Sequence, residues 1–173
     1  HQPDHKNPIN DYLIGGESEA RLRIGLEEII ANKISYLSIK EQNQNRPAEK
    51  FKNNTLATNI EENLPFSLTP DQKKSYQEIA EDMASGSPML RLLQGDVGSG
   101  KTIVAALIAA HVVEDQKQVV ILAPTTILAN QHYESFCEWY GDNENIVLLT
   151  SKLPVREKRQ IYQKISDGIV KII

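Results

Sequence analysis

One stretch constrains this chain more than any other: residues 95–102, which read GDVGSGKT. It fits the pattern G-x-x-x-x-G-K-[ST] of a phosphate-binding loop. Three glycines permit backbone angles that bring successive N–H groups onto phosphate oxygens. A helix that follows such a loop directs the positive end of its dipole at the same oxygens. The residues predicted to hold a nucleotide are Gly95, Asp96, Val97, Gly98, Ser99, Gly100, Lys101 and Thr102.

Two side chains of this loop carry the expected chemistry. Lys101 supplies a positive charge to the β- and γ-phosphates, and the hydroxyl of Thr102 ligates Mg²⁺. A short apolar run at 89–93 precedes the loop, and a longer apolar run at 103–113 follows it. This order of strand, loop and helix is the context that the motif requires. The sequence therefore predicts a nucleotide site in which Lys101 and Thr102 are the catalytic residues and Thr102 is the metal ligand.

Apolar runs and helix-like segments alternate after the loop. The runs at 118–123, 146–149 and 169–173 predict strands of a parallel sheet that is covered on both faces. The segments at 127–140 and 154–166 between them predict helices. This alternation predicts an α/β fold, with a parallel sheet, helices on both of its faces and right-handed crossovers.

The α/β part is expected to begin near residue 64. Thr69 can cap a helix, Pro70 suits its first position, and Gln72 completes a capping box. We therefore divide the chain into a helical connector at residues 1–63 and a nucleotide-binding domain at residues 64–173.

The connector shows no catalytic pattern. Residues 1–16 are polar and interrupted by prolines, which predicts an irregular segment. Ser18 can cap a helix in which Leu22, Leu26 and Ile29 recur at helical spacing. The apolar stripe of this helix requires a partner.

Composition narrows the function only slightly. The chain has 173 residues, of which 40% are hydrophobic, and a net charge of −4, so no broad positive excess indicates nucleic-acid binding. A local basic face would still suffice for it. Cys137 is the only cysteine, which fits a reducing, cytosolic setting, and no apolar run is long enough to span a membrane. The first residue is not Met and the last run is strand-like, so we expect a piece of a longer protein.

Several segments resemble the bacterial RecG helicases of superfamily 2. Residues 89–102 (MLRLLQGDVGSGKT) resemble motif I of that family, and residues 118–132 (QVVILAPTTILANQH) resemble motif Ia. Residues 64–72 resemble the segment that precedes the phosphate loop in superfamily 2, and residues 20–40 more loosely resemble the connector between wedge and motor domains. The resemblance implies the first part of a RecA-like motor domain.

The same resemblance implies a function. RecG helicases are ATP-driven translocases on double-stranded DNA that remodel branched DNA, including stalled forks and Holliday junctions. ATP and Mg²⁺ are the implied cofactors, DNA is the implied partner, and a monomer without membrane contact in a bacterial cytoplasm is the implied setting. The motor of the transcription-repair coupling factor shares both motifs, and a P-loop module without motor activity is a further alternative. A degraded remnant that does not fold is a third reading.

Roles carry over to single residues. Gln72 matches the glutamine that contacts adenine, and the alternative role for it is the capping box alone. Pro124, Thr125 and Thr126 match the part of motif Ia that contacts the DNA backbone, and the alternative is a helix cap. Gln131 and His132 match signature residues of the family.

Two further groups leave alternatives open. The basic residues of the last helix form either a DNA-facing patch or a solvated helix face. Three aromatic residues at helical spacings favour core packing over base stacking. The basic residues are Arg156, Lys158, Arg159 and Lys164, and the aromatic residues are Tyr133, Phe136 and Trp139.

Hydrolysis requires groups that this sequence does not contain. Helicases supply a magnesium-binding carboxylate and a residue that positions water from a D-E-x-[HQD] stretch, and no such stretch occurs here. We therefore expect the chain itself to bind nucleotide weakly at best and to hydrolyse essentially none.

Overall fold

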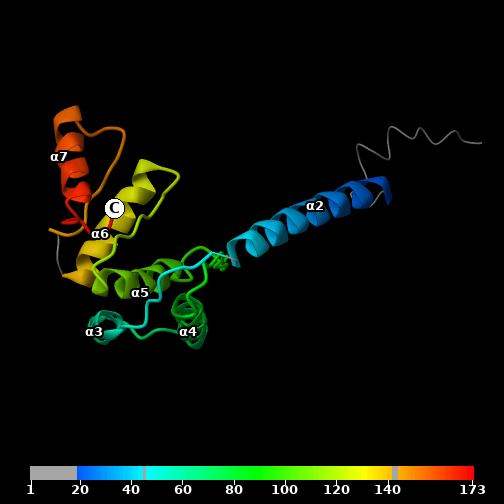
Figure 1. Cartoon of the computed structure of the whole chain (residues 1–173), viewed down its shortest axis with the longest axis horizontal. Coiled ribbons are helices and arrows are strands. Elements are labelled where there is room, and N and C mark those ends of the chain that lie inside the picture. The colour runs from blue at the N-terminus through cyan, green and yellow to red at the C-terminus, as the bar shows by residue number, and fades with distance from the viewer. Residues whose placement is uncertain (1–18, 45, 142–143) are drawn as a thin grey trace, which may run out of the picture. The chain divides into compact units, whose positions relative to one another are not determined.

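A computed structural model describes residues 19–44, 46–141 and 144–173 (Figure 1). The irregular segment expected at 1–16 and the expected cap at Ser18 lie outside the described residues. The chain divides into two compact units between Arg46 and Pro47. The helices of the described part are α2 (Glu19–Gln44), α3 (Thr55–Asn63), α4 (Pro70–Ala84), α5 (Lys101–Glu114), α6 (Thr126–Tyr140) and α7 (Val155–Ser166).

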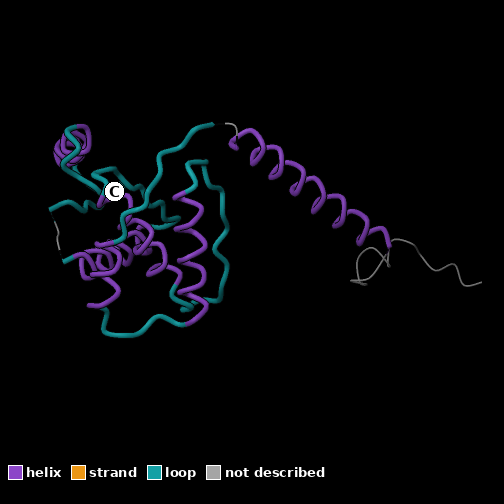
Figure 2. Tube along the Cα trace, turned by 60° about the horizontal axis from the view of Figure 1, so that its bottom comes forward, coloured by secondary structure: helices purple, strands orange, loops and turns teal. Residues whose placement is uncertain are grey.

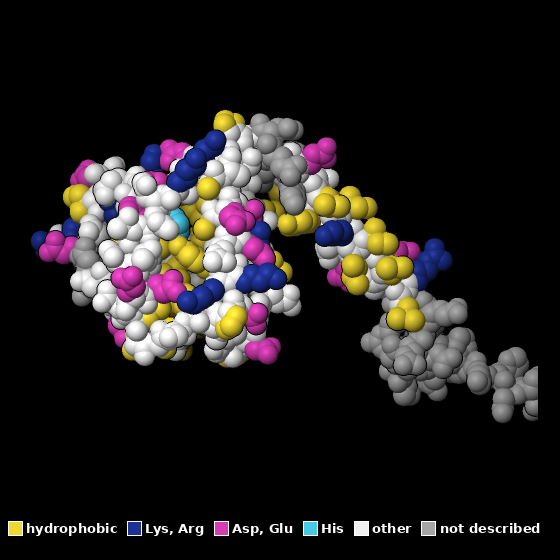
Figure 3. All heavy atoms as spheres, turned by 90° about the horizontal axis from the view of Figure 1, so that it is seen from below, with side chains coloured by type: hydrophobic (Ala, Val, Ile, Leu, Met, Phe, Trp, Pro, Cys, Tyr) yellow, Lys and Arg dark blue, Asp and Glu magenta, His cyan; other side chains and the backbone are white. Residues whose placement is uncertain are grey.

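The first unit contains α2, a helix of 26 residues. The predicted helix is confirmed, and Arg23 pairs with Glu27 one turn later at 3.1 Å. Ile24 and Ile39 lie outside the apolar stripe that begins at Leu22, so apolar side chains are spread around the helix. These side chains are exposed. Hydrophobic side chains gather along this helix in Figure 3. The partner that these side chains require stays a prediction.

The second unit is built around α5. This helix contacts both α3 and α4 (Figure 1), and Figure 2 shows the described residues as helices joined by loops. Ala106, Leu107 and Ala110 are fully buried in it. A helix that is apolar nearly all round must be covered on most sides, and the structure confirms this expectation.

The compact part of the chain begins earlier than residue 64. Phe51 N donates to Met83 O at 3.3 Å, and the ammonium of Lys117 pairs with the carboxylate of Glu49. The amide of Leu56, at the start of α3, donates to Glu114 at the end of α5. Residues 47–63 therefore pack as part of the second unit. The division at residues 63 and 64 concerned the domains of a longer protein, and it stays a prediction.

Three extended segments lie side by side near the last described residues. Ile172 forms parallel bridges with both Val119 and Ile146. Val147 N donates to Ile172 O at 2.9 Å, and Ile173 N donates to Val119 O at 2.9 Å. The last segment therefore lies between the other two, and the parallel direction agrees with the predicted fold.

These contacts do not amount to an assigned sheet. The described residues contain no β-strand, because three of the segments predicted as strands meet through isolated bridges rather than through consecutive ones. The fourth, at 89–94, forms no bridge. The prediction of four strands is not confirmed in this form. The segments concerned are 89–94, 118–123, 146–149 and 169–173.

The segment at 118–123 is covered on one face only. Val120 is 63% exposed and Leu122 is 90% exposed, whereas Val119 and Ile121 are half-buried. Alternate residues of an extended segment point to opposite faces, so one face packs on the core and the other meets solvent. The continuous apolar run predicted burial on both faces, and for these residues that prediction was wrong. Within the described residues, no helix combines the length and hydrophobicity that a bilayer span requires.

Candidate nucleotide-binding site

The predicted phosphate loop connects an extended segment to the start of α5. Gly98 has a φ of +81° and Gly100 a φ of +77°, both in the left-handed region that residues with a Cβ resist. The two glycines bend the chain sharply over 97–100 before the helix begins. The sequence pattern had predicted this use of glycine, and the structure confirms it.

The ammonium of Lys101 lies over the loop itself. Its Nζ donates to the carbonyl oxygens of Gly95 and Asp96 at 2.8 and 2.7 Å, and to Ser99 Oγ at 3.3 Å. These acceptors hold the positive charge at the concave side of the loop, next to the first turn of α5. A phosphate oxygen could take the place of these acceptors, because the Lys101 ammonium already lies beside the loop.

The N-terminus of α5 fits an anion. The helix α5 begins after Gly100 and has no side-chain cap, a property that it shares with α3 and α7, whereas Thr69 and Thr125 cap α4 and α6. What distinguishes α5 is that a glycine-rich loop and Lys101 lie at its start. The first N–H groups of a helix need an acceptor, and a phosphate supplies several. The loop, the lysine and the uncapped helix thus together suit a triphosphate. Thr102 lies half-buried in this first turn, where its hydroxyl can serve as the predicted Mg²⁺ ligand.

The metal site has a single predicted protein ligand. Over the residues that the structure describes, no group of three or more His, Cys, Asp or Glu side chains could hold a metal ion.

Gln72 joins α4 to the loop. Its Oε1 accepts from Thr69 N at 2.8 Å while Thr69 Oγ1 accepts from Gln72 N at 3.2 Å, which confirms the predicted capping box. Its Nε2 donates to Ser99 O at 2.9 Å. A single side chain therefore completes the start of one helix and binds the backbone of the phosphate loop.

A cavity of about 320 Å³ lies where these two elements meet. Its volume falls in the usual range for a small-molecule site. It is lined by Gln72 and Ser75 from α4, by the loop, and by Lys101 and Val104 from α5. The cavity therefore brings Gln72 together with four of the predicted loop residues, Gly95, Ser99, Gly100 and Lys101. The other four, Asp96, Val97, Gly98 and Thr102, do not line it.

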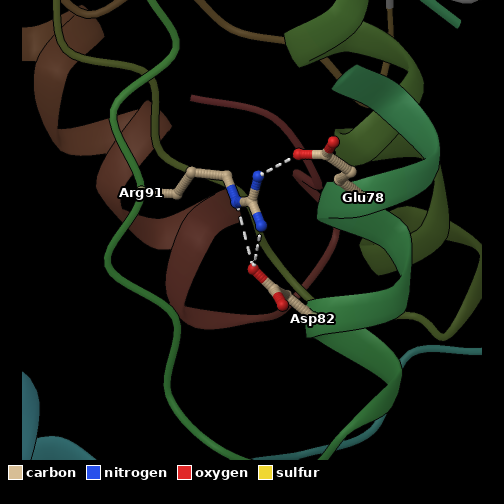
Figure 4. Close-up of polar contacts among 3 residues, drawn as sticks. All are labelled: Glu78, Asp82 and Arg91. Carbon is tan, nitrogen blue, oxygen red and sulfur yellow. Dashed lines mark hydrogen bonds and ion pairs between the residues drawn. The ribbon is translucent and has the colours of Figure 1, made fainter. Parts of the chain in front are cut away.

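Arg91 is a residue that sequence reasoning missed. It precedes the loop, and its guanidinium reaches Glu78 at 2.8 Å and Asp82 at 2.7 Å, both on α4 (Figure 4). The hydrogen bond to Asp82 is the largest cause of a raised pKa of Arg91, and the hydrogen bond to Glu78 is the second. The segment that leads into the loop is thereby fastened to α4. A charged residue within the apolar run at 89–93 was the signal that could have revealed it.

The residues of motif Ia lie at the start of α6. Thr125 is the N-cap, and its Oγ1 accepts from Leu128 N at 3.3 Å, so the cap is confirmed. Pro124 precedes it and Thr126 is the first helical residue. The hydroxyl proton of Thr125 is not used in that bond, so the DNA contact is compatible with the cap and stays a prediction.

The aromatic residues of α6 pack into the core. Phe136 is 1% exposed and stacks on Tyr140 with 5.7 Å between ring centroids. Tyr140 Oη donates to Ala106 O at 2.7 Å, and burial raises the pKa of Tyr140 above its ordinary value. Tyr133 and Trp139 pack against the same cluster, which confirms core packing rather than base stacking. The basic residues on α7 are mostly exposed, and their contact with DNA stays a prediction.

Comparison with known proteins agrees with this geometry. Residues 69–173, more than half of the chain, match the DEAD/DEAH box helicase family. The matched region begins at the Thr69 cap and includes the phosphate loop.

Individual relatives share one description, ATP-dependent DNA helicase RecG. The chain is 46% identical to the Aquifex aeolicus protein over 65% of this chain, and 41% identical to the Escherichia coli K12 protein over 82% of it. It is 34% identical to the Haemophilus influenzae protein over 94% of the chain. These matches confirm the resemblance found in the sequence. They cover only 14%, 20% and 24% of the lengths of the three relatives.

Proposed function

The chain belongs to the DEAD/DEAH box helicase family, and we propose that it is the nucleotide-binding part of an ATP-dependent DNA helicase of the RecG type. The observation that carries the proposal is the cavity at the phosphate loop. Gln72, Lys101 and the uncapped start of α5 meet there. In the whole protein the site would bind ATP with Mg²⁺, and the energy of ATP hydrolysis would drive movement along DNA.

Each residue has a definite part in this proposal. Lys101 exchanges the carbonyl oxygens of Gly95 and Asp96 for oxygens of the β- and γ-phosphates. The backbone N–H groups of 98–102 surround the same phosphates. The hydroxyl of Thr102 ligates Mg²⁺, and Gln72 faces the adenine. Bound ATP supplies the phosphoanhydride bond. The chain positions the phosphates and compensates their negative charge through Lys101.

The DNA-binding surface is proposed from motif Ia. Thr125 and Thr126 provide small hydroxyls and N–H groups at the start of α6, and Pro124 directs the chain into this start, so that a DNA phosphate can be bound there. Basic and acidic side chains are interspersed on the face of the second unit that Figure 3 shows. Binding through a few backbone contacts fits such a surface better than a broad electrostatic one. We propose that the whole protein acts as a monomer on branched and double-stranded DNA in a bacterial cytoplasm.

The proposal extends to the fold. The parallel contacts of Ile172 with Val119 and Ile146 support a RecA-like sheet to which 89–94 also contributes a strand. The exposed apolar side chains of Val120 and Leu122 support further cover on the open face of that sheet.

Turnover by this chain alone is expected to be negligible. The sequence lacks a D-E-x-[HQD] stretch, so the Mg²⁺ carboxylate and the residue that positions water are not supplied by it. ATP turnover with branched DNA that Lys101→Ala abolishes would contradict this expectation.

Nucleotide binding is tested by titrating the 173-residue chain with Mg²⁺ and a fluorescent ATP analogue. Loss of a charge-assisted contact predicts that Lys101→Ala weakens binding at least tenfold. The matched control is Lys152→Ala, which removes an exposed lysine from a turn before α7 and should bind as the parent chain does. Equal affinities for all three chains would overturn the proposed site.

A further inference from the structure

The amide of Gln72 is bonded at both of its polar ends. Its oxygen accepts from Thr69 N in the capping box, and its nitrogen donates to Ser99 O, 27 positions further along the chain. A cap needs only the first of these bonds. The second attaches α4 to the phosphate loop, and neither role assigned to Gln72 above requires it.

We propose that Gln72 is a positioning residue for the phosphate loop: it holds the Ser99 carbonyl and thereby fixes the loop in its phosphate-binding form. The inference rests on the proposed nucleotide site. It gives Gln72 a role that acts on the phosphates, whatever base the nucleotide carries.

The position of the bond explains its effect. The peptide group between Ser99 and Gly100 is planar and trans, so its C=O and N–H point in opposite directions. Holding Ser99 O at Gln72 therefore turns the N–H of Gly100 away from α4. The backbone that follows enters α5 at Lys101, so the orientation of this peptide sets the first N–H groups of the helix.

The absence of a side chain at Gly100 makes the bond possible. A Cβ built on Gly100 would overlap Gln72 Nε2, whereas a Cβ on Gly98 would meet nothing within 4 Å. Both glycines have a positive φ, so conformation alone does not distinguish them. Because Nε2 is the end of a flexible side chain, a Cβ at position 100 would displace this amide from Ser99, whereas a Cβ at position 98 would leave it in place.

The helix that carries Gln72 is itself fixed relative to the loop. Arg91, four positions before Gly95, is bonded to Glu78 and Asp82 on α4 (Figure 4). The contacts of Arg91 thus hold α4 beside the segment that leads into the loop, independently of the bond from Gln72 to Ser99.

A contact with adenine does not exclude this role. The amide nitrogen has a second hydrogen and the amide oxygen a second lone pair, and neither is used in the two bonds described. The two roles differ in the ligand on which they act. A base contact affects only ligands that carry adenine, whereas a loop-positioning contact affects any ligand that carries the phosphates.

The test compares ATP with inorganic tripolyphosphate, each with Mg²⁺, by calorimetric titration of the 173-residue chain. The proposal predicts that Gln72→Ala weakens the binding of both ligands by about fivefold, as expected for the loss of one hydrogen bond that orders the site. Unchanged tripolyphosphate affinity with weakened ATP affinity would overturn it, since Gln72 would then contact only the base. Unchanged affinity for both ligands would overturn it as well.

The control separates capping from positioning. Thr69→Val removes the hydroxyl half of the capping box and leaves the bond between Gln72 and Ser99. It should lower the melting temperature of the chain but leave tripolyphosphate affinity within about twofold of the parent. A loss in Thr69→Val as large as in Gln72→Ala would assign the effect to α4 stability and overturn the proposal.

Failure of the proposed nucleotide site gives a different result. In that case the parent chain binds neither ligand, although circular dichroism shows that it is folded. If Gln72→Ala does not fold, Gly100→Ala displaces the same amide while Gln72 remains in place, and Gly98→Ala serves as its control because it brings the same backbone strain without meeting Gln72. The proposal then predicts a larger loss of both ligands for Gly100→Ala than for Gly98→Ala, and equal losses would overturn it.

Discussion

The two left-handed glycines of the phosphate loop provide a matched pair of substitutions. Gly98→Ala and Gly100→Ala both place a Cβ at a φ near +80°. Only the Cβ at position 100 meets Gln72. If Gln72 positions the loop, the second substitution must weaken phosphate binding more than the first.

The expected difference follows from two contributions. A left-handed alanine costs about 1–2 kcal/mol at either position. At position 100 the Cβ also displaces Gln72 Nε2 from Ser99 O, and a typical hydrogen bond contributes about 1 kcal/mol. We therefore expect Gly98→Ala to weaken tripolyphosphate binding by about tenfold and Gly100→Ala by about fivefold more.

The assay is calorimetric titration of each variant with tripolyphosphate and Mg²⁺, in the parent chain and in a Gln72→Ala background. Without the amide at position 72 there is nothing for the new Cβ to displace, so the two glycine substitutions should become equivalent in that background. Such a double-mutant comparison isolates the contribution of the contact. Equal losses in the parent background would refute the reasoning, and so would a difference that persists in the Gln72→Ala background.

Two further predictions concern the core that supports the site. Tyr140→Phe removes the bond to Ala106 O and should lower the free energy of unfolding by about 1 kcal/mol in urea titration, while Tyr162→Phe, at a residue that is 55% exposed, should not change it. Burial lowers the pKa of His111, so the unfolded chain binds a proton at a higher pH than the folded chain does. The free energy of unfolding should therefore fall as pH decreases below about 6.5, down to the lowered pKa of the folded state. Urea titrations between pH 8 and pH 5 measure how the free energy of unfolding changes with pH, and His111→Phe should reduce this change. An unchanged pH dependence in His111→Phe would contradict the lowered pKa of His111 as its cause.

Local chemistry could be predicted from the sequence. The capping box of Thr69 and Gln72 depends on residues three positions apart, and the left-handed angles of Gly98 and Gly100 follow from the loop pattern. The burial of α5 follows from its apolar composition. In each case the signal and the structure lie within one turn or one helix.

Contacts between distant segments could not be predicted. The bonds from Gln72 to Ser99 and from Arg91 to α4 depend on how α4 packs beside the loop, which no local pattern specifies. The exposure of Val120 and Leu122 could not be predicted either. A continuous apolar run is compatible with cover on one face or on both faces, so the sequence does not distinguish the two cases. Sequence spacing fixes the period of a segment, and packing decides which of its faces meets a neighbour.

The most direct test of the central claim is a titration of the isotopically labelled chain with Mg²⁺ and ATP, followed by amide chemical shifts in NMR spectra. The account predicts that the largest changes occur at residues 95–102 and at the side-chain amide of Gln72, and that Lys101→Ala reduces all of them together. Binding with the largest changes elsewhere, or no change at millimolar ATP in a folded chain, would contradict the assignment of this loop as the nucleotide site.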